Sequence, residues 1–386
     1  MGVQHARTEA GADVSNIEQG WFAKPWKSAI SVIPQQHRGK TVGVRTFTNK
    51  EFGGDVRVFY PTEDPIGDAK AAGWFSPSLS TMVDGYAHFM AGWKESLRKG
   101  TWMFEVISSI LRFVVACGSL KTAKLPCTYQ ELKPASKKAP LIIWSHGLSG
   151  TGEEHGLFAA RLATEGYVVA LMHHTDGSSS KVTTADGRTI YFQHPDWNNY
   201  DEAYRQKGAE HRAKEVENVR QMLLSGEAGE DLQAACDETR VAVGGFSFGG
   251  ATAALVAATM PEHYKCAVLW DGWFHIVLDS IQLYRDLPRQ AFERGFSIPV
   301  CFIGSGQFAA MDKLADATKR IQATCRAGME AHVQEHSVHM SFCDMVWWLP
   351  SPLLAKFGFS DKTSPYQTYL EILGLTTDFL KLHIPA

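Results

Sequence analysis

A glycine-rich turn between a strand and a helix constrains this chain more than any other feature of its sequence. Residues 244–250 read Gly-Gly-Phe-Ser-Phe-Gly-Gly, between an apolar run at 241–243 and another at 251–256. Ser247 stands at the tip of the predicted turn. The glycines at 245 and 249 lack Cβ atoms, so the strand and the helix can approach closely. Free N–H groups at the start of the helix can then bind a developing oxyanion.

The frame Gly245-x-Ser247-x-Gly249 is the nucleophile elbow of α/β-hydrolases, in which a strained turn lifts the serine above the sheet. A chain rich in glycine matches this five-residue frame often, and an ordinary strand-to-helix turn is the alternative interpretation. The strand before the serine and the helix after it favour the elbow. We therefore predict that Ser247 is a nucleophile.

Apolar strands and helices alternate along the rest of the chain. A strand that ends at a proline is predicted at 56–60, continuous apolar strands at 141–144, 167–172, 241–244, 266–270 and 300–303, and a last strand near 331–337. Helical patterns cover 157–165 and 209–224. This alternation predicts an α/β-hydrolase fold, with a mostly parallel central sheet and helices on both faces. We expect residues 51–386 to form this domain and residues 1–50, which are polar and irregular, to form an N-terminal extension.

The composition is that of an ordinary globular protein. The 386 residues are 45% hydrophobic and 20% charged, and the formal net charge of −3 gives no reason to expect a nucleic-acid partner. The seven cysteines are scattered without a CxxC motif, which favours a reducing compartment. The first residues lack the apolar stretch of a secretory signal, so we expect a cytoplasmic protein. Myristoylation of Gly2 would use an incomplete motif, because position 6 is Ala6.

A serine nucleophile needs a base, and the base needs an acid that orients it. In α/β-hydrolases the order along the chain is serine, acid, histidine. Asp271 directly follows the strand 266–270, where a carboxylate would lie at the carboxyl edge of the sheet. A helix cap or turn is the alternative role for Asp271. Asp279 and Asp344 are the weaker alternatives for the acid.

The position of His339 just past the last predicted strand makes it the expected base. His336 is its nearest competitor, and position alone separates the two. The oxyanion would be bound by two backbone N–H groups, that of Phe248 after the nucleophile and that of Leu148 in the loop after the strand 141–144. A simple turn at the end of that strand is the alternative interpretation of the loop.

Five segments of the chain occur in the order found in one known family. They are Val58-Phe59-Tyr60-Pro61, Trp144-Ser145-His146-Gly147-Leu148, Gly245-x-Ser247-Phe248-Gly249-Gly250-Ala251-Thr252, Leu269-x-Asp271-x-Trp273 and Ser337-Val338-His339-x-x-Phe342-x-Asp344. With these segments the chain resembles the platelet-activating-factor acetylhydrolase family, the group VII phospholipases A2, over roughly residues 55–382.

The resemblance implies that Ser247, Asp271 and His339 are nucleophile, acid and base, with Leu148 and Phe248 as oxyanion donors. It implies calcium-independent hydrolysis of short or oxidised sn-2 acyl esters of phospholipids, with no metal or organic cofactor. The chain departs from the family pattern at Phe246, where a histidine is typical, and at 173–177, which lacks two arginines. A broader lipase, phospholipase A1 or carboxylesterase is the first alternative function. A non-catalytic binding protein on the same fold is the second.

A largely apolar stretch at 102–117 predicts contact with a lipid surface. As a helix it would present one narrow polar stripe and an apolar surface that includes Trp102, Met103, Phe104, Ile107, Ile110 and Leu111. It is too short and too charged for a comfortable membrane span. Basic residues flank it on both sides, as in helices that lie in a lipid interface. A helix packed between the sheet and a lid is the alternative. The family uses a helix in this region to reach lipid, so we expect a peripheral membrane or lipoprotein-like partner surface.

Two further motifs are discounted. His332 and His336 fit a zinc motif only if they share a helix face, and in a strand residues four apart lie about 13 Å apart. The glycines at 304 and 306 resemble part of a dinucleotide fingerprint, but no βαβ unit with an acidic partner follows them.

Overall fold

The computed structural model describes residues 25–76, 78–93, 109, 119–194, 202–279, 295–356, 358–359 and 364–386. The predicted lipid-interface helix at 102–117 lies outside the described residues except for Ser109, and so does Gly2. In the part of the chain that the structure describes, no helix is long and apolar enough to cross a membrane.

A ten-stranded mixed sheet forms the centre of the molecule, with the order β12-β11-β10-β9-β5-β6-β2-β1-β4-β3. Its strands are β1 (Thr41–Thr48), β2 (Asp55–Thr62), β3 (Ala71–Gly73), β4 (Lys124–Gln130), β5 (Ala139–Ser145), β6 (Val168–Met172), β9 (Cys236–Phe246), β10 (Cys266–Trp270), β11 (Val300–Ser305) and β12 (Met329–Gln334). The six strands from β12 to β6 are parallel. β2 is antiparallel to both of its neighbours, β6 and β1. A separate two-stranded sheet pairs β7 (Lys181–Thr183) with β8 (Thr189–Tyr191).

Helices of very different lengths connect and cover these strands. The α-helices are α1 (Leu79–Trp93), α3 (Gly156–Thr164), α4 (Glu202–Ser225), α5 (Glu230–Ala235), α6 (Phe248–Thr259), α7 (His275–Asp279), α9 (Gly306–Ala309), α10 (Asp312–Gln322), α11 (Met345–Trp348), α12 (Ser351–Lys356) and α13 (Pro365–His383). The 3-10 helices are η1 (Pro25–Val32), η2 (Gln35–His37), η4 (Ser119–Thr122), η5 (Gly152–His155), η6 (Pro261–His263) and η8 (His339–Phe342).

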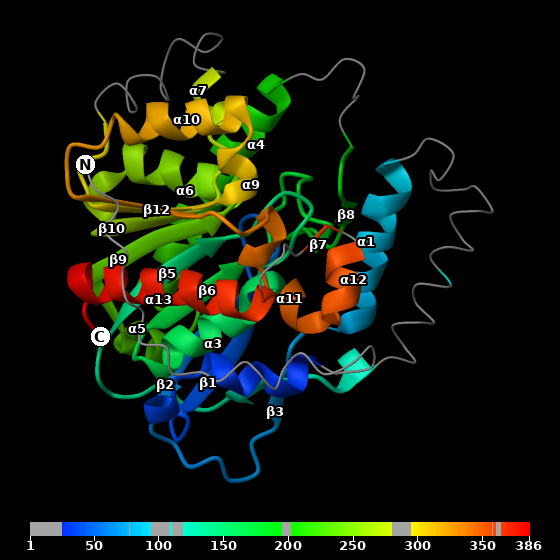
Figure 1. Cartoon of the computed structure of the whole chain (residues 1–386). Coiled ribbons are helices and arrows are strands. Elements are labelled where there is room, and N and C mark those ends of the chain that lie inside the picture. The colour runs from blue at the N-terminus through cyan, green and yellow to red at the C-terminus, as the bar shows by residue number, and fades with distance from the viewer. Residues whose placement is uncertain are drawn as a thin grey trace.

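Two hydrophobic cores lie on opposite faces of the sheet. α3 and α13 cover one face, where Trp144, Phe158 and Trp270 are buried together. α4, α6 and α10 cover the other face, where they pack on residues such as Val243 and Phe302 (Figure 1). Because both faces are covered, successive residues of the central strands are all buried, as in Ala139–Ser145 of β5. The predicted α/β-hydrolase arrangement is confirmed, and the carboxyl ends of β5, β9, β10 and β11 meet at one edge of the sheet.

The sheet also begins earlier in the chain than expected. β1 (Thr41–Thr48) pairs along its whole length with β2, from Thr41 opposite Thr62 to Thr48 opposite Asp55. A strand that precedes the expected boundary at residue 51 therefore belongs to the central sheet. This strand was not predicted because β1 mixes buried and exposed positions without a continuous apolar run.

Candidate active site

Ser247 lies between the end of β9 and the start of α6, in a strained backbone conformation. Its φ of 59° and ψ of −117° are in a region that residues other than glycine rarely adopt, at a cost of about 1–3 kcal/mol. The Ser247 N–H donates to the Trp270 carbonyl (2.9 Å), and the Ser247 carbonyl accepts from the Trp273 N–H (2.9 Å). A Cβ on Gly245 would lie 2.3 Å from the Gly249 oxygen. Only glycine at 245 lets the strand and helix meet so closely, and the turn holds Ser247 at the strand end.

His339 and Asp271 complete a hydrogen-bonded chain with this serine. His339 Nε2 lies 2.9 Å from Ser247 Oγ, and His339 Nδ1 lies 2.6 Å from Asp271 Oδ2. The Asp271 carboxylate is buried and also accepts from the Ser305 N–H and hydroxyl, both at 2.7 Å. The backbone N–H of His339 donates to Gln307 Oε1 (2.7 Å). The arrangement allows proton transfer from a serine hydroxyl to an imidazole that a buried carboxylate holds in place.

The loop after β5 lies beside Ser247. A Cβ on Gly147 would lie 3.3 Å from Ser247 Cβ, and a Cβ on Gly249 would lie 2.0 Å from the Ser145 oxygen. The loop and the first turn of α6 are thus in contact around the serine. The backbone N–H groups of Leu148 and Phe248 donate to no hydrogen-bond acceptor among the described residues. Both are therefore available to an oxyanion formed next to Ser247.

A family model described as platelet-activating factor acetylhydrolase, isoform II, matches residues 31–385. The chain belongs to this family. It is 24% identical over 322 residues to the platelet-activating factor acetylhydrolase of Cavia porcellus, an alignment that covers 76% of this chain and 64% of that protein. It is 26% identical over 307 residues to the Bos taurus protein of the same name, with 72% and 61% covered. The chain thus spans a little under two thirds of the length of these acetylhydrolases.

A solved structure shows the same fold. The ferulic acid esterase from Streptomyces cinnamoneus superposes with a TM-score of 0.62 and 18% identity, over 89% of this chain and 90% of that one. At this identity the likeness concerns the fold alone, which is that of an α/β-hydrolase.

The alternative acids and base lie elsewhere or carry other contacts. Asp344 is buried and accepts from Trp74 Nε1 (2.9 Å), the Leu157 N–H (2.7 Å) and the Tyr369 hydroxyl (2.5 Å). Burial raises the pKa of Asp344 to about 7, against the effect of these donors. Asp279 is the last residue of α7, and its side chain is outside the described part. His336 is exposed after β12, and no described contact joins it to Ser247 or Asp271.

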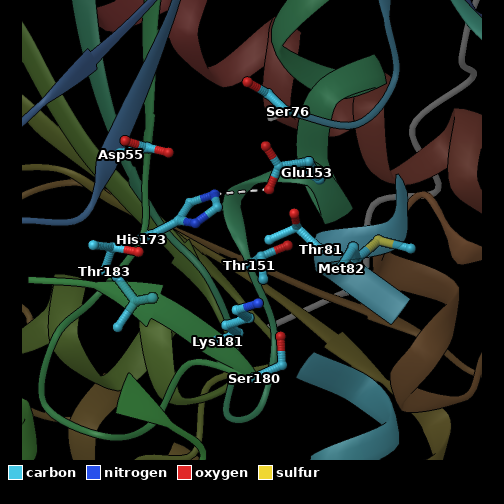
Figure 2. Close-up of a pocket in the computed structure, with 11 residues that line it drawn as sticks. Asp55, Ser76, Thr81, Met82, Thr151, Glu153, His173, Ser180, Lys181 and Thr183 are labelled. Carbon is cyan, nitrogen blue, oxygen red and sulfur yellow. Dashed lines mark ion pairs between the residues drawn. The ribbon is translucent and has the colours of Figure 1, made fainter. Parts of the chain in front are cut away.

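A small cavity separate from the triad is lined mainly by residues of polar types, from β2, α1, η5 and the segment 173–183. Figure 2 shows His173 directed toward Glu153 across this cavity, with Thr151 and Ser180 in its lining. His173 Nε2 lies 2.7 Å from Glu153 Oε2. The Thr151 and Ser180 hydroxyls are buried and find no hydrogen-bond partner among the described residues. The volume of about 60 Å³ is enough to hold water.

A larger cavity of about 250 Å³ is lined by Asp271 and by residues from the ends of β10 and β11 and from helix α10. Its lining is mainly apolar and includes Phe274, Phe302 and Phe308 but neither Ser247 nor His339.

Among the described residues, Cys301, Glu330 and His332 place their potential metal-ligand atoms within 4.8 Å of one another. This group lies on β11 and β12, and β12 contains His332 as a strand residue, so the discounted helical zinc motif does not form.

Proposed function

We propose that this chain is a serine esterase that hydrolyses the short or oxidised sn-2 acyl ester of phospholipids such as platelet-activating factor. The observation that carries the proposal is the Ser247–His339–Asp271 chain of hydrogen bonds (2.9 and 2.6 Å) on a strained elbow. Membership of the acetylhydrolase family supports the class of substrate. Ser247 is the nucleophile, His339 the base and Asp271 the acid that orients it.

In the first step His339 Nε2 takes the proton of the Ser247 hydroxyl while Oγ attacks the ester carbonyl carbon. The carbonyl π electrons move to oxygen, and the Leu148 and Phe248 N–H groups stabilise the resulting oxyanion. Asp271 accepts the Nδ1–H of His339, which fixes the tautomer and stabilises the imidazolium. Removal of one oxyanion donor typically lowers kcat by about 10²–10³.

In the second step the bond between the acyl carbon and the lysolipid oxygen breaks, and the imidazolium of His339 gives its proton to that oxygen. The acyl group is then an ester on Ser247. A water molecule, deprotonated by His339, attacks the acyl carbon, and the carboxylic acid leaves as Ser247 Oγ takes back the proton. Protein groups handle every proton and the oxyanion charge in this scheme, so we propose that the reaction needs no calcium.

A fluorophosphonate probe tests the class of enzyme, because it reacts with activated serines. We expect labelling of the wild-type protein at Ser247, found by peptide mapping, and none in Ser247→Ala. Folded Ser247→Ala should lose at least about 10⁴ in kcat for acetyl ester hydrolysis. Absence of labelling with a folded protein would favour a non-catalytic binding protein.

The substrate class is tested separately with phospholipids of increasing sn-2 chain length, in the presence and absence of EDTA. We expect turnover that falls steeply beyond short chains and does not change with the chelator. Equal turnover of long chains, or cleavage at sn-1, would replace the proposal by a broader lipase, a phospholipase A1 or a carboxylesterase. Loss of activity in EDTA that calcium restores would contradict the calcium-independent mechanism.

A further inference from the structure

The direction of the Leu148 N–H is fixed by what binds the oxygen on the other side of the same peptide. In a trans peptide the C=O of Gly147 and the N–H of Leu148 point in opposite directions. The Gly147 carbonyl lies 2.7 Å from Nδ1 of His146 and accepts the Gly150 N–H at 3.3 Å. A rotation of this peptide would aim a carbonyl oxygen at the substrate, so the bonds to Gly147 decide whether the loop can bind an anion.

The His146 imidazole has a single tautomer that fits its surroundings. A carbonyl oxygen can only accept, so Nδ1 carries the proton and donates to Gly147. The Nε2 atom accepts from the backbone N–H of His174 at 3.3 Å. Burial, the nearby Arg212 charge and His174 keep the pKa of His146 well below its usual value, so the ring is neutral. The fully buried ring is thus a rigid donor aimed at one peptide oxygen.

Arg212 of α4 holds the neighbouring peptide and the second donor residue. Its Nη1 donates to the His146 carbonyl (2.7 Å), and its guanidinium lies 4.4 Å above the ring of Phe248. The side chain is fully buried. It is held in turn by the Ser178 hydroxyl, which accepts from Nε at 2.9 Å, and by Asp176, whose Oδ2 lies 3.4 Å from Nε. One rigid cation therefore contacts the peptide that precedes the Leu148 donor and the side chain of the residue that contains the Phe248 donor.

We propose that His146 and Arg212 are positioning residues that aim the Leu148 N–H at the oxyanion formed on the acyl group. The proposal rests on the proposed serine esterase mechanism and deepens it. His146 fixes the peptide that contains the donor, and Arg212 fixes the peptide before it together with Phe248. Neither side chain contacts the substrate. Their effect on the rate comes from donors that are already oriented when the negative charge develops.

The conservative variants His146→Asn and Arg212→Lys are compared with His146→Leu and Arg212→Gln. An asparagine amide can replace Nδ1–H as a donor to Gly147, whereas leucine cannot. The matched controls are His155→Leu and Arg205→Gln. His155 is a buried histidine whose ring nitrogens have no hydrogen-bond partner in the described part of the chain. Arg205 is a buried arginine on α4 that stacks on Phe192, 5.3 Å from its ring centre.

Two quantities are measured for each variant with a soluble acetyl ester. The first is kcat per active site titrated with a fluorophosphonate, so that misfolded protein is not counted. The second is the inhibition constant of a trifluoromethyl ketone, whose adduct with Ser247 carries an oxyanion. We expect His146→Leu and Arg212→Gln to lower kcat by roughly 10²-fold, with KM nearly unchanged. The inhibition constant of the ketone should rise by a similar factor. The kcat of His146→Asn and Arg212→Lys should be at least about tenfold higher than that of His146→Leu and Arg212→Gln, respectively. The kcat of the control variants should stay close to that of the wild type.

A merely structural role would lower the titratable fraction or the melting temperature and leave kcat per site and ketone affinity unchanged. That result, or an equal loss in the control variants, would overturn the proposal. Failure of the serine esterase mechanism itself gives a different outcome. Ser247→Ala would then keep its activity, and the inhibition constant of the ketone would not change in proportion to kcat in any variant.

Discussion

The ring of Phe246 packs on the imidazole of His339, with 4.6 Å between the ring centres and 31° between their planes. A second ring, that of Phe308, stacks on the same imidazole at 4.1 Å and 8°. His339 is thus held by two hydrogen bonds through its ring nitrogens and by two aromatic contacts. These contacts hold the imidazole ring in the orientation in which its Nε2 atom faces Ser247.

Replacement of Phe308 by Ala tests this aromatic support. Aromatic pairs contribute about 0.5–1.5 kcal/mol beyond burial, so a less ordered imidazole should lower kcat by roughly threefold to tenfold. Phe308→Tyr keeps the ring and serves as the control. Steady-state kinetics with a soluble acetyl ester measure the effect, and kcat equal to that of the wild type in Phe308→Ala would show that the ring does not order His339.

Asp271→Asn and Asp344→Asn should differ in what they damage. The first removes the acceptor of His339 Nδ1–H and should lower kcat by about 10⁴ with little change in melting temperature. The second disturbs a buried carboxyl that binds Trp74, Leu157 and Tyr369, and should reduce the free energy of unfolding by about 1–3 kcal/mol. Activity per titrated site should survive in Asp344→Asn. A large loss of kcat in Asp344→Asn with little loss in Asp271→Asn would instead assign the role of the acid to Asp344.

His339→Gln should lower kcat by about 10⁴ or more, whereas His336→Gln should leave it within a factor of two or three. His339 alone of the pair lies within hydrogen-bonding distance of Ser247 and Asp271 among the described residues. Kinetics of both purified variants decide the matter. A larger loss in His336→Gln than in His339→Gln would contradict the assignment of the base.

The buried carboxyl of Glu154 predicts how stability changes with pH. Burial raises its pKa from 4.5 to about 7, although the hydrogen bond from the Tyr86 hydroxyl acts in the opposite direction. The folded state therefore keeps the proton over a range in which the unfolded chain loses it. The contribution of Glu154 is most favourable below the unfolded pKa and is lost as pH rises toward the folded pKa.

Glu154→Gln cannot lose a proton and should not show this change. The difference in free energy of unfolding between Glu154→Gln and the wild type should shift in favour of the variant by up to roughly 3 kcal/mol between pH 4.5 and 8. Denaturant titrations at several pH values measure the difference. A difference independent of pH would mean that Glu154 ionises as it does in an unfolded chain.

Replacing Trp102 and Phe104 by Ser tests the predicted contact of residues 102–117 with lipid. Burial of one large apolar side chain contributes about 1.5–3 kcal/mol, so the double variant should partition onto liposomes at least about tenfold more weakly. Hydrolysis of p-nitrophenyl acetate should change little, because these positions are far in sequence from the proposed nucleophile. Liposome sedimentation measures partitioning. Unchanged partitioning with a much lower melting temperature would place the segment in the core instead.

The fold could be predicted where the sequence signal is local. The parallel strands β5, β6, β10 and β11 and the second half of β9 are continuous apolar runs because both faces are covered, and the elbow is encoded by glycines on each side of Ser247. The short strand β3 and the mixed strands β1 and β4 were not predicted. They lie at the outer part of the sheet, where exposed positions interrupt the apolar pattern.

The sequence by itself determined the type of turn at Ser247 and the strand ends at which Asp271 and Leu148 lie, because both depend on neighbouring residues. Only the tertiary structure decided that Asp271 and His339, rather than Asp344 and His336, lie in a hydrogen-bonded chain with Ser247. That decision depends on the order β9-β10-β11-β12, which brings the ends of separate strands together. The contacts of Ser305 with Asp271 and of Arg212 with His146 arise in the same way. They join residues 34 and 66 positions apart, a separation at which no local pattern of residue types indicates which side chains will meet.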